Sequence, residues 1–196
     1  MFLRSMIFSG GCEPVLQGEG VTLRYLRTGD FAAWSALRLE SREFLTPWEA
    51  TWAPDELSRV AFRRRLRRYQ QEIRNDTSYP FLVIRSADNA LIGGCALSNV
   101  RRGVTQTAML GYWIGSAFAR QGYMTAAIKA ILPFAFTVLG LHRVEAACIP
   151  ENDPSRRLLT KLGFHEEGRV RGYLQINGEW HDHILFALLE DDPLVG

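Results

Sequence analysis

The sequence has few cysteines, little excess charge and no long hydrophobic run. Its 196 residues include three cysteines, and 23 basic and 21 acidic side chains give a formal net charge of +2 at pH 7. Cys12, Cys95 and Cys148 form no C-x-x-C pair and no zinc-ligand spacing with histidine, so we expect reduced, mostly buried thiols and no metal site. Near-balanced charge excludes strong binding to nucleic acid or anionic lipid through the overall field, so any basic surface must be local.

The sequence also lacks the signals of export and of membrane insertion. No stretch approaches the roughly 18 apolar residues of a membrane helix, and residues 1–8 lack the long apolar run and the cleavage site of a signal peptide. We therefore expect a cytoplasmic protein. Its length fits one domain, residues 1–196, with about residues 1–19 as a loosely structured N-terminal extension.

The first half of the sequence predicts one strand followed by two helices. Residues 21–26 alternate apolar and polar side chains, as a strand does, and Asp30 can cap the helix that follows. Residues 44–48 are interpreted as an apolar loop, and Pro54 with neighbouring acids predicts a second helix starting at residues 53–56. The residues expected to face the core are Trp34, Leu37 and Leu39 on the first helix and Phe62, Leu66, Tyr69 and Ile73 on the second.

The second half predicts an antiparallel meander and then alternating helices and strands. The expected elements are strands at 81–84, 91–97 and up to 114, a helix at 125–139 that Pro133 should kink or break, a strand at 143–149, a short helix from Asn152 closed by Gly163, and two strands joined at Asn177-Gly178. This order indicates a mixed α/β layer with helices on both faces of a sheet.

Two helix starts carry the candidate chemistry. At the first, a strand leads through a loop into a helix after Gly122, and unpaired helical N–H groups there form an anion site. Gly122 lets the backbone approach a diphosphate, Arg120 adds charge and Thr125 can offer its hydroxyl. The second start lies at residues 152–155. If the preceding strands are neighbours, both starts open at one end of the sheet, where one ligand could touch both. A plain surface turn and a simple helix cap are the alternative interpretations.

These segments resemble a known superfamily. Residues 122–127, Gly-Tyr-Met-Thr-Ala-Ala, are similar to the pyrophosphate-binding motif of GNAT acetyltransferases, and residues 152–155 with Leu-Gly-Phe at 162–164 resemble its second signature. Residues 42–49, 98–103 and 172–183 resemble the RimJ branch, whose members acetylate the N-terminal alanine of a ribosomal protein. The resemblance covers about residues 20–190. It implies the GNAT fold, an α/β (α+β) architecture with a mixed, mostly antiparallel sheet of six to seven strands and about four helices.

The resemblance also implies acetyl-CoA as co-substrate, without a metal, and a set of binding residues. Those implied for acetyl-CoA are Tyr112, Trp113, Ile114, Ala119, Arg120, Gln121, Gly122, Tyr123, Met124, Thr125, Asn152 and Ser155. Those implied for the acceptor are Phe44, Leu45, Trp48, Glu49 and Tyr112, although the apolar loop could equally be a satellite cluster packed on the sheet. The sequence departs from the superfamily at Ala119, where Arg or Gln is frequent, and at Met109, where related enzymes often have Glu.

The implied reaction is direct attack of an amine on the thioester in a ternary complex. We assign Ser155 as proton donor to the leaving thiolate or as its hydrogen-bond partner, and Asn152 as the residue that orients the pantetheine arm. Tyr173 is the second candidate acid. Glu43, Glu49, Glu167 and a water chain all remain open as general base. An N-terminal α-amine, with a pKa of about 7.7 to 8.0, needs less help from a base than lysine at about 10.4.

Several alternatives stay open at this stage. The acceptor could be a small amine such as an antibiotic, polyamine or amino acid, or the chain could be a catalytically weak CoA-binding factor of the ribosome. The arginine run at residues 63–68 fits the solvated face of an amphipathic helix, with contact to ribosomal RNA or an acidic partner as the alternative. A protein N-terminus is the expected acceptor, and the chain is expected to be a monomer or homodimer.

Overall fold

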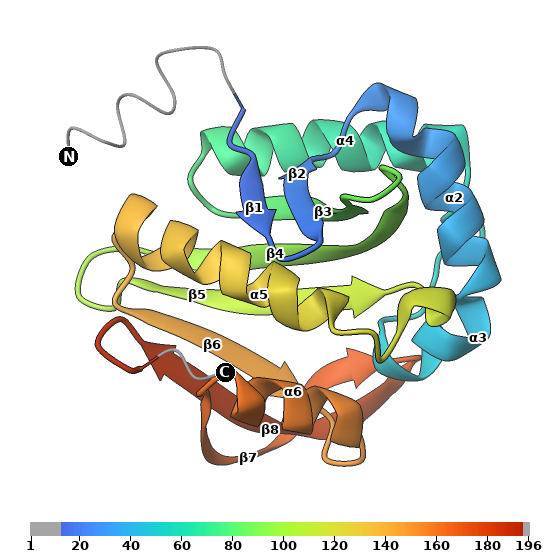
Figure 1. Ribbon diagram of the computed structural model, residues 1–196. Coiled ribbons are helices and arrows are strands. Elements are labelled where there is room, and N and C mark those ends of the chain that lie inside the picture. The colour runs from blue at the N-terminus through green and yellow to red at the C-terminus, as the bar shows by residue number, and fades with distance from the viewer. Residues whose placement is uncertain (1–12, 194–196) are drawn as a thin grey trace.

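The computed structural model of the protein describes residues 13–193 (Figure 1), and its centre is one eight-stranded sheet in the order β1-β2-β3-β4-β5-β6-β8-β7. The strands are β1 (Leu16–Gly18), β2 (Val21–Tyr25), β3 (Tyr79–Arg85), β4 (Leu91–Arg101), β5 (Thr107–Ile114), β6 (Arg143–Cys148), β7 (His165–Ile176) and β8 (Glu179–Leu189). The α-helices are α2 (Phe31–Glu40), α3 (Arg42–Leu45), α4 (Arg59–Arg74), α5 (Tyr123–Pro133) and α6 (Asp153–Lys161). The predicted mixed, mostly antiparallel α/β fold is confirmed.

All neighbouring strands are antiparallel except β5 and β6, which run parallel. The predicted meander of β3, β4 and β5 is therefore confirmed, as is the β7–β8 hairpin at Asn177-Gly178. Both turn residues have positive φ, 47° and 92°, which is the backbone geometry of a tight type I′ turn and explains the Asn-Gly pair.

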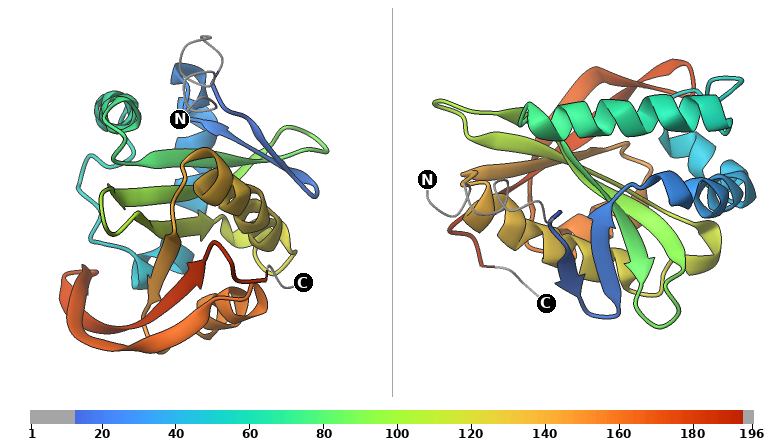
Figure 2. Two further views of the ribbon diagram at one scale, coloured as in Figure 1. Left: turned by 90° about the vertical axis from the view of Figure 1, so that its left-hand side faces the viewer. Right: turned by 90° about the horizontal axis from the view of Figure 1, so that it is seen from above.

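Helices cover both faces of the sheet, as the element order predicts. Along β3, Phe81 and Val83 join a large core with α5 and α6, whereas Leu82 and Ile84 join a smaller core with α2 and α4. This alternation follows from the two-residue period of a strand. Figure 2 shows α4 and α5 on opposite sides of the sheet. The two faces are therefore separate environments with separate roles.

The structure has one strand more than the upper limit expected and five α-helices where about four were expected. The additional strand is β1, which lies within the predicted loose extension. Its three residues pair with β2 from Leu16↔Leu23 to Gly18↔Val21. A three-residue edge strand is too short to show an alternating pattern, and only pairing with β2 defines it. Residues 1–12, with Cys12, lie outside the described residues, whereas Cys95 and Cys148 are buried free thiols.

Two local predictions at helix starts are wrong. The Asp30 carboxylate does not cap α2; it accepts the Arg27 backbone N–H (2.7 Å) and pairs with Arg24 (2.7 Å). The second helix begins at Arg59 instead of residues 53–56, because the Ser58 hydroxyl accepts the Ala61 N–H (3.1 Å) and supplies the cap.

Further differences concern α2 and the segments after it. Leu39, expected in the core, is 59% exposed, while Trp34 and Leu37 are buried as predicted. Residues 44–48 are not a loop: α3 and a 3-10 turn at Thr46–Trp48 form successive helical turns. Pro133 ends α5, and the chain continues in π-helical hydrogen bonding over Phe134–Val138, so the predicted interruption at this proline is confirmed.

Candidate functional site

The parallel strands β5 and β6 pair only over their first halves. Their register runs from Thr107↔Arg143 to Met109↔Glu145 and stops there. Beyond this point β5 keeps only β4 as a neighbour and β6 keeps only β8. The carboxyl ends of the two strands therefore diverge, and each leads into a helix, α5 or α6. This is the end of a sheet at which α/β proteins bind ligands.

The start of α5 is an uncapped helix N-terminus. Gly122 precedes it with φ of +84°, and no side chain accepts a hydrogen bond from its first turn. The first helical backbone bond runs from the Ala126 N–H to the Gly122 carbonyl (3.0 Å). A Cβ atom at Gly122 would meet no heavy atom within 4 Å, so the space beside this helix start is open. A helix start of this kind is suited to anionic oxygens, which is the ligand group expected here from the sequence.

The loop before Gly122 contributes differently from residue to residue. Arg120 is exposed and has φ of +61°, so its guanidinium is free to reach phosphate oxygens. The Gln121 side chain instead donates to the Ala117 carbonyl (2.8 Å) and stiffens the loop. Met124, one of the implied ligand contacts, buries its side chain in the core at 8% exposure, which leaves its backbone N–H as the group that can reach a ligand.

The start of α6 is joined to β5 by a hydroxyl pair. The Asn152 Oδ1 atom accepts the Ser155 N–H (3.2 Å), and Ser155 Oγ lies 2.6 Å from Tyr112 Oη. Burial raises the pKa of Tyr112 well above its usual range, a shift that the hydrogen bond with Ser155 partly offsets. Both hydroxyls therefore stay protonated at neutral pH and can relay a proton. The condition named in the sequence analysis is met, because the strands before the two helix starts, β5 and β6, are neighbours and run parallel.

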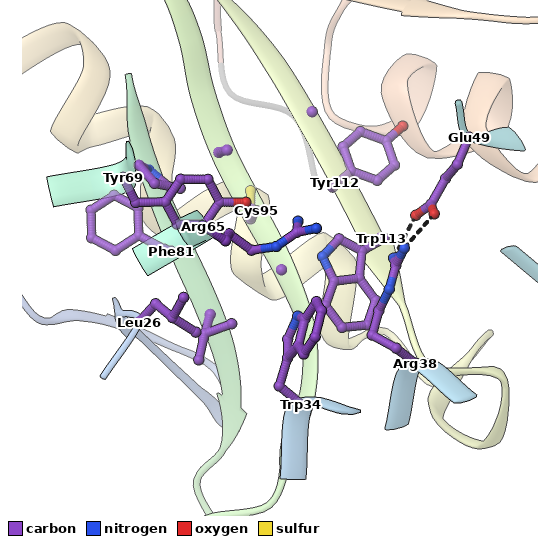
Figure 3. A pocket seen from close by; sticks show the side chains of 15 residues that line it. Leu26, Trp34, Arg38, Glu49, Arg65, Tyr69, Phe81, Cys95, Tyr112 and Trp113 are labelled. Atoms are coloured by element: carbon purple, nitrogen blue, oxygen red, sulfur yellow. Dashed lines mark hydrogen bonds and ion pairs between the residues drawn. The ribbon is translucent and has the colours of Figure 1, made fainter. Parts of the chain in front are cut away.

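A second cavity, which we call the acceptor pocket, lies against the α2 and α4 face of the sheet (Figure 3) and has a volume of about 270 Å³. The residues that line it are Leu26, Trp34, Arg38, Glu49, Arg65, Tyr69, Pro80, Phe81, Leu82, Gly94, Cys95, Ala96, Gly111, Tyr112 and Trp113. Gly111 has no side chain to fill the space above it, since a Cβ atom there would meet nothing within 4 Å. Tyr112 belongs to both the hydroxyl pair and the pocket lining, so the two regions adjoin.

A buried ion pair holds one wall of the acceptor pocket. Arg38, only 5% exposed, donates to both carboxylate oxygens of Glu49 (2.7 and 2.6 Å), and Trp52 Nε1 donates to Glu49 Oε2 (2.9 Å). The Arg38 guanidinium also lies over the rings of Trp52 (4.3 Å) and Trp113 (4.9 Å). The β7–β8 hairpin is tied to the same segment, because the Asn177 N–H donates to the Glu49 carbonyl (2.8 Å).

The acceptor residues implied by the sequence are only partly brought together. Glu49 and Tyr112 line the pocket. Phe44 and Trp48 are exposed at 43% and 39%, and Leu45 is buried, but none of these three lines it. Among the acetyl-CoA residues, Trp113 also lines the acceptor pocket, and Ile114 packs against the core.

The remaining candidate acid and bases lie elsewhere. Tyr173 on β7 is half-buried with its ring against His183 (5.7 Å, edge to face), and burial lowers the pKa of His183. Glu43 is exposed on α3. Glu167 is ion-paired with Arg143, which lowers its pKa, and Arg143 opens β6 at the end away from the diverging strands.

Sequence reasoning did not assign to the site the four residues that α2 and α4 contribute to the lining of the acceptor pocket: Trp34, Arg38, Arg65 and Tyr69. Trp34 and Tyr69 were assigned to the core only. Arg38 follows Trp34 by four positions, so it shares the apolar face of α2. A charged residue on that face is the signal that could have identified it, because a buried charge needs a partner. Its partner Glu49 lies in a different segment.

The geometry combines two helix starts beyond diverging parallel strands with a pocket on the α2 and α4 face of the sheet. Residues 21–165 match the family described as "Acetyltransferase (GNAT) domain". The chain belongs to the GNAT acetyltransferase family and is a GNAT N-acetyltransferase with acetyl-CoA as co-substrate.

The chain is also similar in sequence and in structure to individual acetyltransferases. It is 36% identical over 178 residues to "Probable N-acetyltransferase YjcK" of Bacillus subtilis, covering 91% of this chain and 98% of that one. It is 33% identical over 153 residues to the "[Ribosomal protein uS5]-alanine N-acetyltransferase" of Escherichia coli, covering 78% and 79%. The solved structure of Mycobacterium smegmatis RimJ in complex with CoA-disulfide aligns with a TM-score of 0.84 at 34% identity, covering 91% and 87%.

The donor side of the site fits the co-substrate that the family uses. The uncapped α5 N-terminus and the exposed Arg120 suit a pyrophosphate, and the half-paired strands leave backbone groups for an amide-containing arm. Within residues 13–193, no group of His, Cys, Asp and Glu side chains could hold a metal ion, and no helix is long and apolar enough to cross a membrane.

Proposed function

We propose that this enzyme acetylates the N-terminal α-amine of a protein, with the N-terminal alanine of a ribosomal protein as its acceptor. The Escherichia coli relative is named for this activity on uS5, and two features of the acceptor pocket support it independently. One is the state of its carboxylate, and the other is a pair of buried guanidinium N–H groups.

On the donor side, the chain's own groups position the thioester and protonate the leaving group. The N–H groups at the α5 start and Arg120 hold the pyrophosphate. Asn152 Nδ2, which has no hydrogen-bond partner among the described residues, is available to orient the pantetheine arm. As the amine nitrogen bonds to the acetyl carbon and the C–S bond breaks, Ser155 Oγ gives its proton to the sulfur and takes the Tyr112 Oη proton across the 2.6 Å hydrogen bond. The nitrogen releases its surplus proton to water, and Tyr112 regains a proton from water, so that both hydroxyls are restored.

The pocket contains no carboxylate suited to act as a general base. Glu49 is its lining carboxylate, and both of its oxygens accept hydrogen bonds from Arg38. A lysine side chain, with an ordinary pKa of about 10.4, would need such a base, whereas an α-amine at about 7.7 to 8.0 has a free-base fraction at pH 7 of roughly one tenth, a few hundred times that of lysine. The pairing of Glu49 therefore favours an N-terminal amine over lysine and over a polyamine, which would need unpaired acids.

The observation that carries the proposal is a pair of orphan donors. The Nε atoms of Arg38 and Arg65 are buried and have no hydrogen-bond partner among the described residues, and both side chains line the acceptor pocket. Figure 3 shows the Arg65 side chain extending into the pocket. Buried donors are rarely left unpaired in native proteins. Because both atoms are closed to solvent, the two side chains must shift before a ligand can reach them. After such a shift, backbone carbonyls of a bound peptide would satisfy them, and a simple amine without carbonyl groups would not.

The test is to incubate the protein with labelled acetyl-CoA and peptides that differ in their first residue. We expect label on the N-terminus of peptides that start with alanine. The matched control is the same alanine peptide with a blocked N-terminus and a free internal lysine, which should stay unlabelled. Transfer only to lysine or to small amines would overturn the proposal.

A further inference from the structure

Helix α4 has two faces with different roles. Its inner face packs Phe62 into the smaller core and presents Arg65 and Tyr69 to the acceptor pocket. Its outer face carries a shallow groove on the opposite side of the same helix. The residues that line this groove are Val60, Arg63, Arg64, Arg67, Arg68 and Gln71. A molecule bound in the outer groove would thus be separated from the acceptor pocket by the width of α4.

The positive charge of the chain is concentrated on this helix. The formal net charge of the whole chain is only +2, yet α4 carries a single acid, Glu72, and seven arginines: Arg59, Arg63, Arg64, Arg65, Arg67, Arg68 and Arg74. Like charges four residues apart, at 63 and 67 and at 64 and 68, destabilise a helix. A purely solvated face does not need this repetition.

Few of the outer arginines are neutralised. Arg64 forms an ion pair with Asp55 at 3.3 Å, and Arg68 forms one with Glu72 at 3.5 Å. Except for Glu72, these side chains are about half exposed or more. Solvent therefore screens both pairs, and they are weak. Within residues 13–193, Arg63 and Arg67 form no ion pair. The centre of the outer groove therefore presents two free guanidinium groups that lie on one side of a rigid helix.

We propose that the outer face of α4 binds the phosphate backbone of RNA that accompanies the acceptor protein. This inference rests on the proposed ribosomal acceptor. Planar guanidinium forks bind phosphate oxygens in a bidentate manner, and arginines four residues apart repeat every ~6 Å along a helix. Protein interfaces centre on apolar and aromatic anchors, but Val60 is the sole apolar residue of this groove. Interfaces with nucleic acid are polar and positive, as this one is.

The position of the groove gives the contact a function. Because α4 separates it from the acceptor pocket, RNA held on the outer face keeps a tethered protein N-terminus near the pocket entrance. Tethering raises the effective concentration of the acceptor without any new contact in the pocket. Acetylation of a free peptide, which carries no RNA, does not use the outer face.

The test measures binding of a fluorescent RNA oligonucleotide by anisotropy over a range of salt concentrations. The variant Arg63→Gln/Arg67→Gln removes the two unpaired charges, and Lys161→Gln/Arg171→Gln removes two exposed charges elsewhere as a matched control. We expect the α4 variant to lose about tenfold or more in affinity at low salt and to show a salt slope smaller by about 1.4 to 1.8, the value for two phosphate contacts. The control should stay within about twofold of wild type.

Further measurements separate this inference from the proposed function. Acetylation of a free alanine peptide should be equal in wild type and the α4 variant, and circular dichroism should show equal helix content. If wild type fails to acetylate any N-terminal peptide, the proposed function fails, while RNA binding is still measured directly. Equal RNA affinity in the α4 variant and wild type overturns the inference. So does tighter binding of a polyglutamate peptide or of anionic lipid vesicles than of RNA.

Discussion

At the scale of single residues, we expect the rate of acetyl transfer to depend on the hydrogen-bonded hydroxyls of Tyr112 and Ser155. We predict that Ser155→Ala lowers kcat by about 10- to 100-fold, since general acid catalysis contributes 10² or more and Tyr112 can partly replace the hydroxyl. Affinity for acetyl-CoA should change less than about threefold, since the helix cap uses the Ser155 backbone N–H, which alanine keeps. Steady-state kinetics and calorimetry measure the two quantities. An unaltered kcat would reduce Ser155 to a cap residue.

Tyr112 also sets an expectation for the pH dependence. Burial raises its pKa, so the neutral phenol is favoured by folding. Its contribution to stability is full below the unfolded value of about 10 and is lost only as the pH rises beyond that. We predict that the rate on an alanine peptide rises with amine deprotonation near pH 8 and does not fall again below about pH 10. A descending limb between pH 8 and 9.5 that disappears in Tyr112→Phe would contradict this.

At the scale of elements, the α5 N-terminus can be tested against a matched glycine. Gly122 and Gly103 both have positive φ, 84° and 74°, and at both a Cβ atom meets nothing within 4 Å. A side chain at either costs a similar ~1–2 kcal/mol of backbone strain. We predict that Gly122→Glu raises the Kd for CoA by tenfold or more, because the carboxylate occupies an anion site. Gly103→Glu, in the β4–β5 turn, should leave Kd within about twofold. Equal Kd values for the two variants would remove the phosphate role of Gly122.

Gly111 provides the corresponding test of the acceptor pocket. Space is open above it, its φ is not in the left-handed region, and it lies on a strand that lines the pocket. We predict that Gly111→Leu raises KM for the alanine peptide by about fivefold or more by filling the pocket, at less than ~1.5 kcal/mol in stability. Gly111→Ala should have a smaller effect in the same direction. If instead CoA affinity falls and peptide KM stays constant, the pocket belongs to the donor.

The elements show how far the sequence could lead. Local signals were sufficient where one short segment decides the structure: Asn177-Gly178 predicted the hairpin, and Asn152 predicted the start of α6. They failed where partners from other segments decide. Asp30 lies at a helix start, but Arg24 and the Arg27 N–H take its carboxylate. Helix α4 begins later than predicted, because Ser58 caps it and the proline and acids at residues 54–56 do not start it.

At the scale of the whole molecule, the acceptor pocket was beyond sequence reasoning for a physical reason. Its walls come from α2, α4, β3, β4, β5 and the segment at Glu49. These segments are far apart in the sequence, and only folding of the sheet brings them together. The Arg38–Glu49 pair spans two of these segments. The two helix starts proposed to hold acetyl-CoA were predictable as structural elements, because each follows a continuous strand and loop whose motif the superfamily shares.

Binding of acetyl-CoA should stabilise the whole fold against unfolding. A ligand that binds only the native state stabilises it by RT ln(1 + [L]/Kd), about 2.7 kcal/mol at a hundredfold excess over Kd. For a chain of this size each kcal/mol corresponds to about 2–4 °C, so acetyl-CoA should raise the Tm by about 5 to 11 °C. Ser155→Ala should keep the shift and lose turnover, whereas Gly122→Glu should lose both. A full Tm shift in wild type without turnover on any amine would identify a CoA-binding protein that has lost catalysis, since binding and chemistry depend on different helix starts.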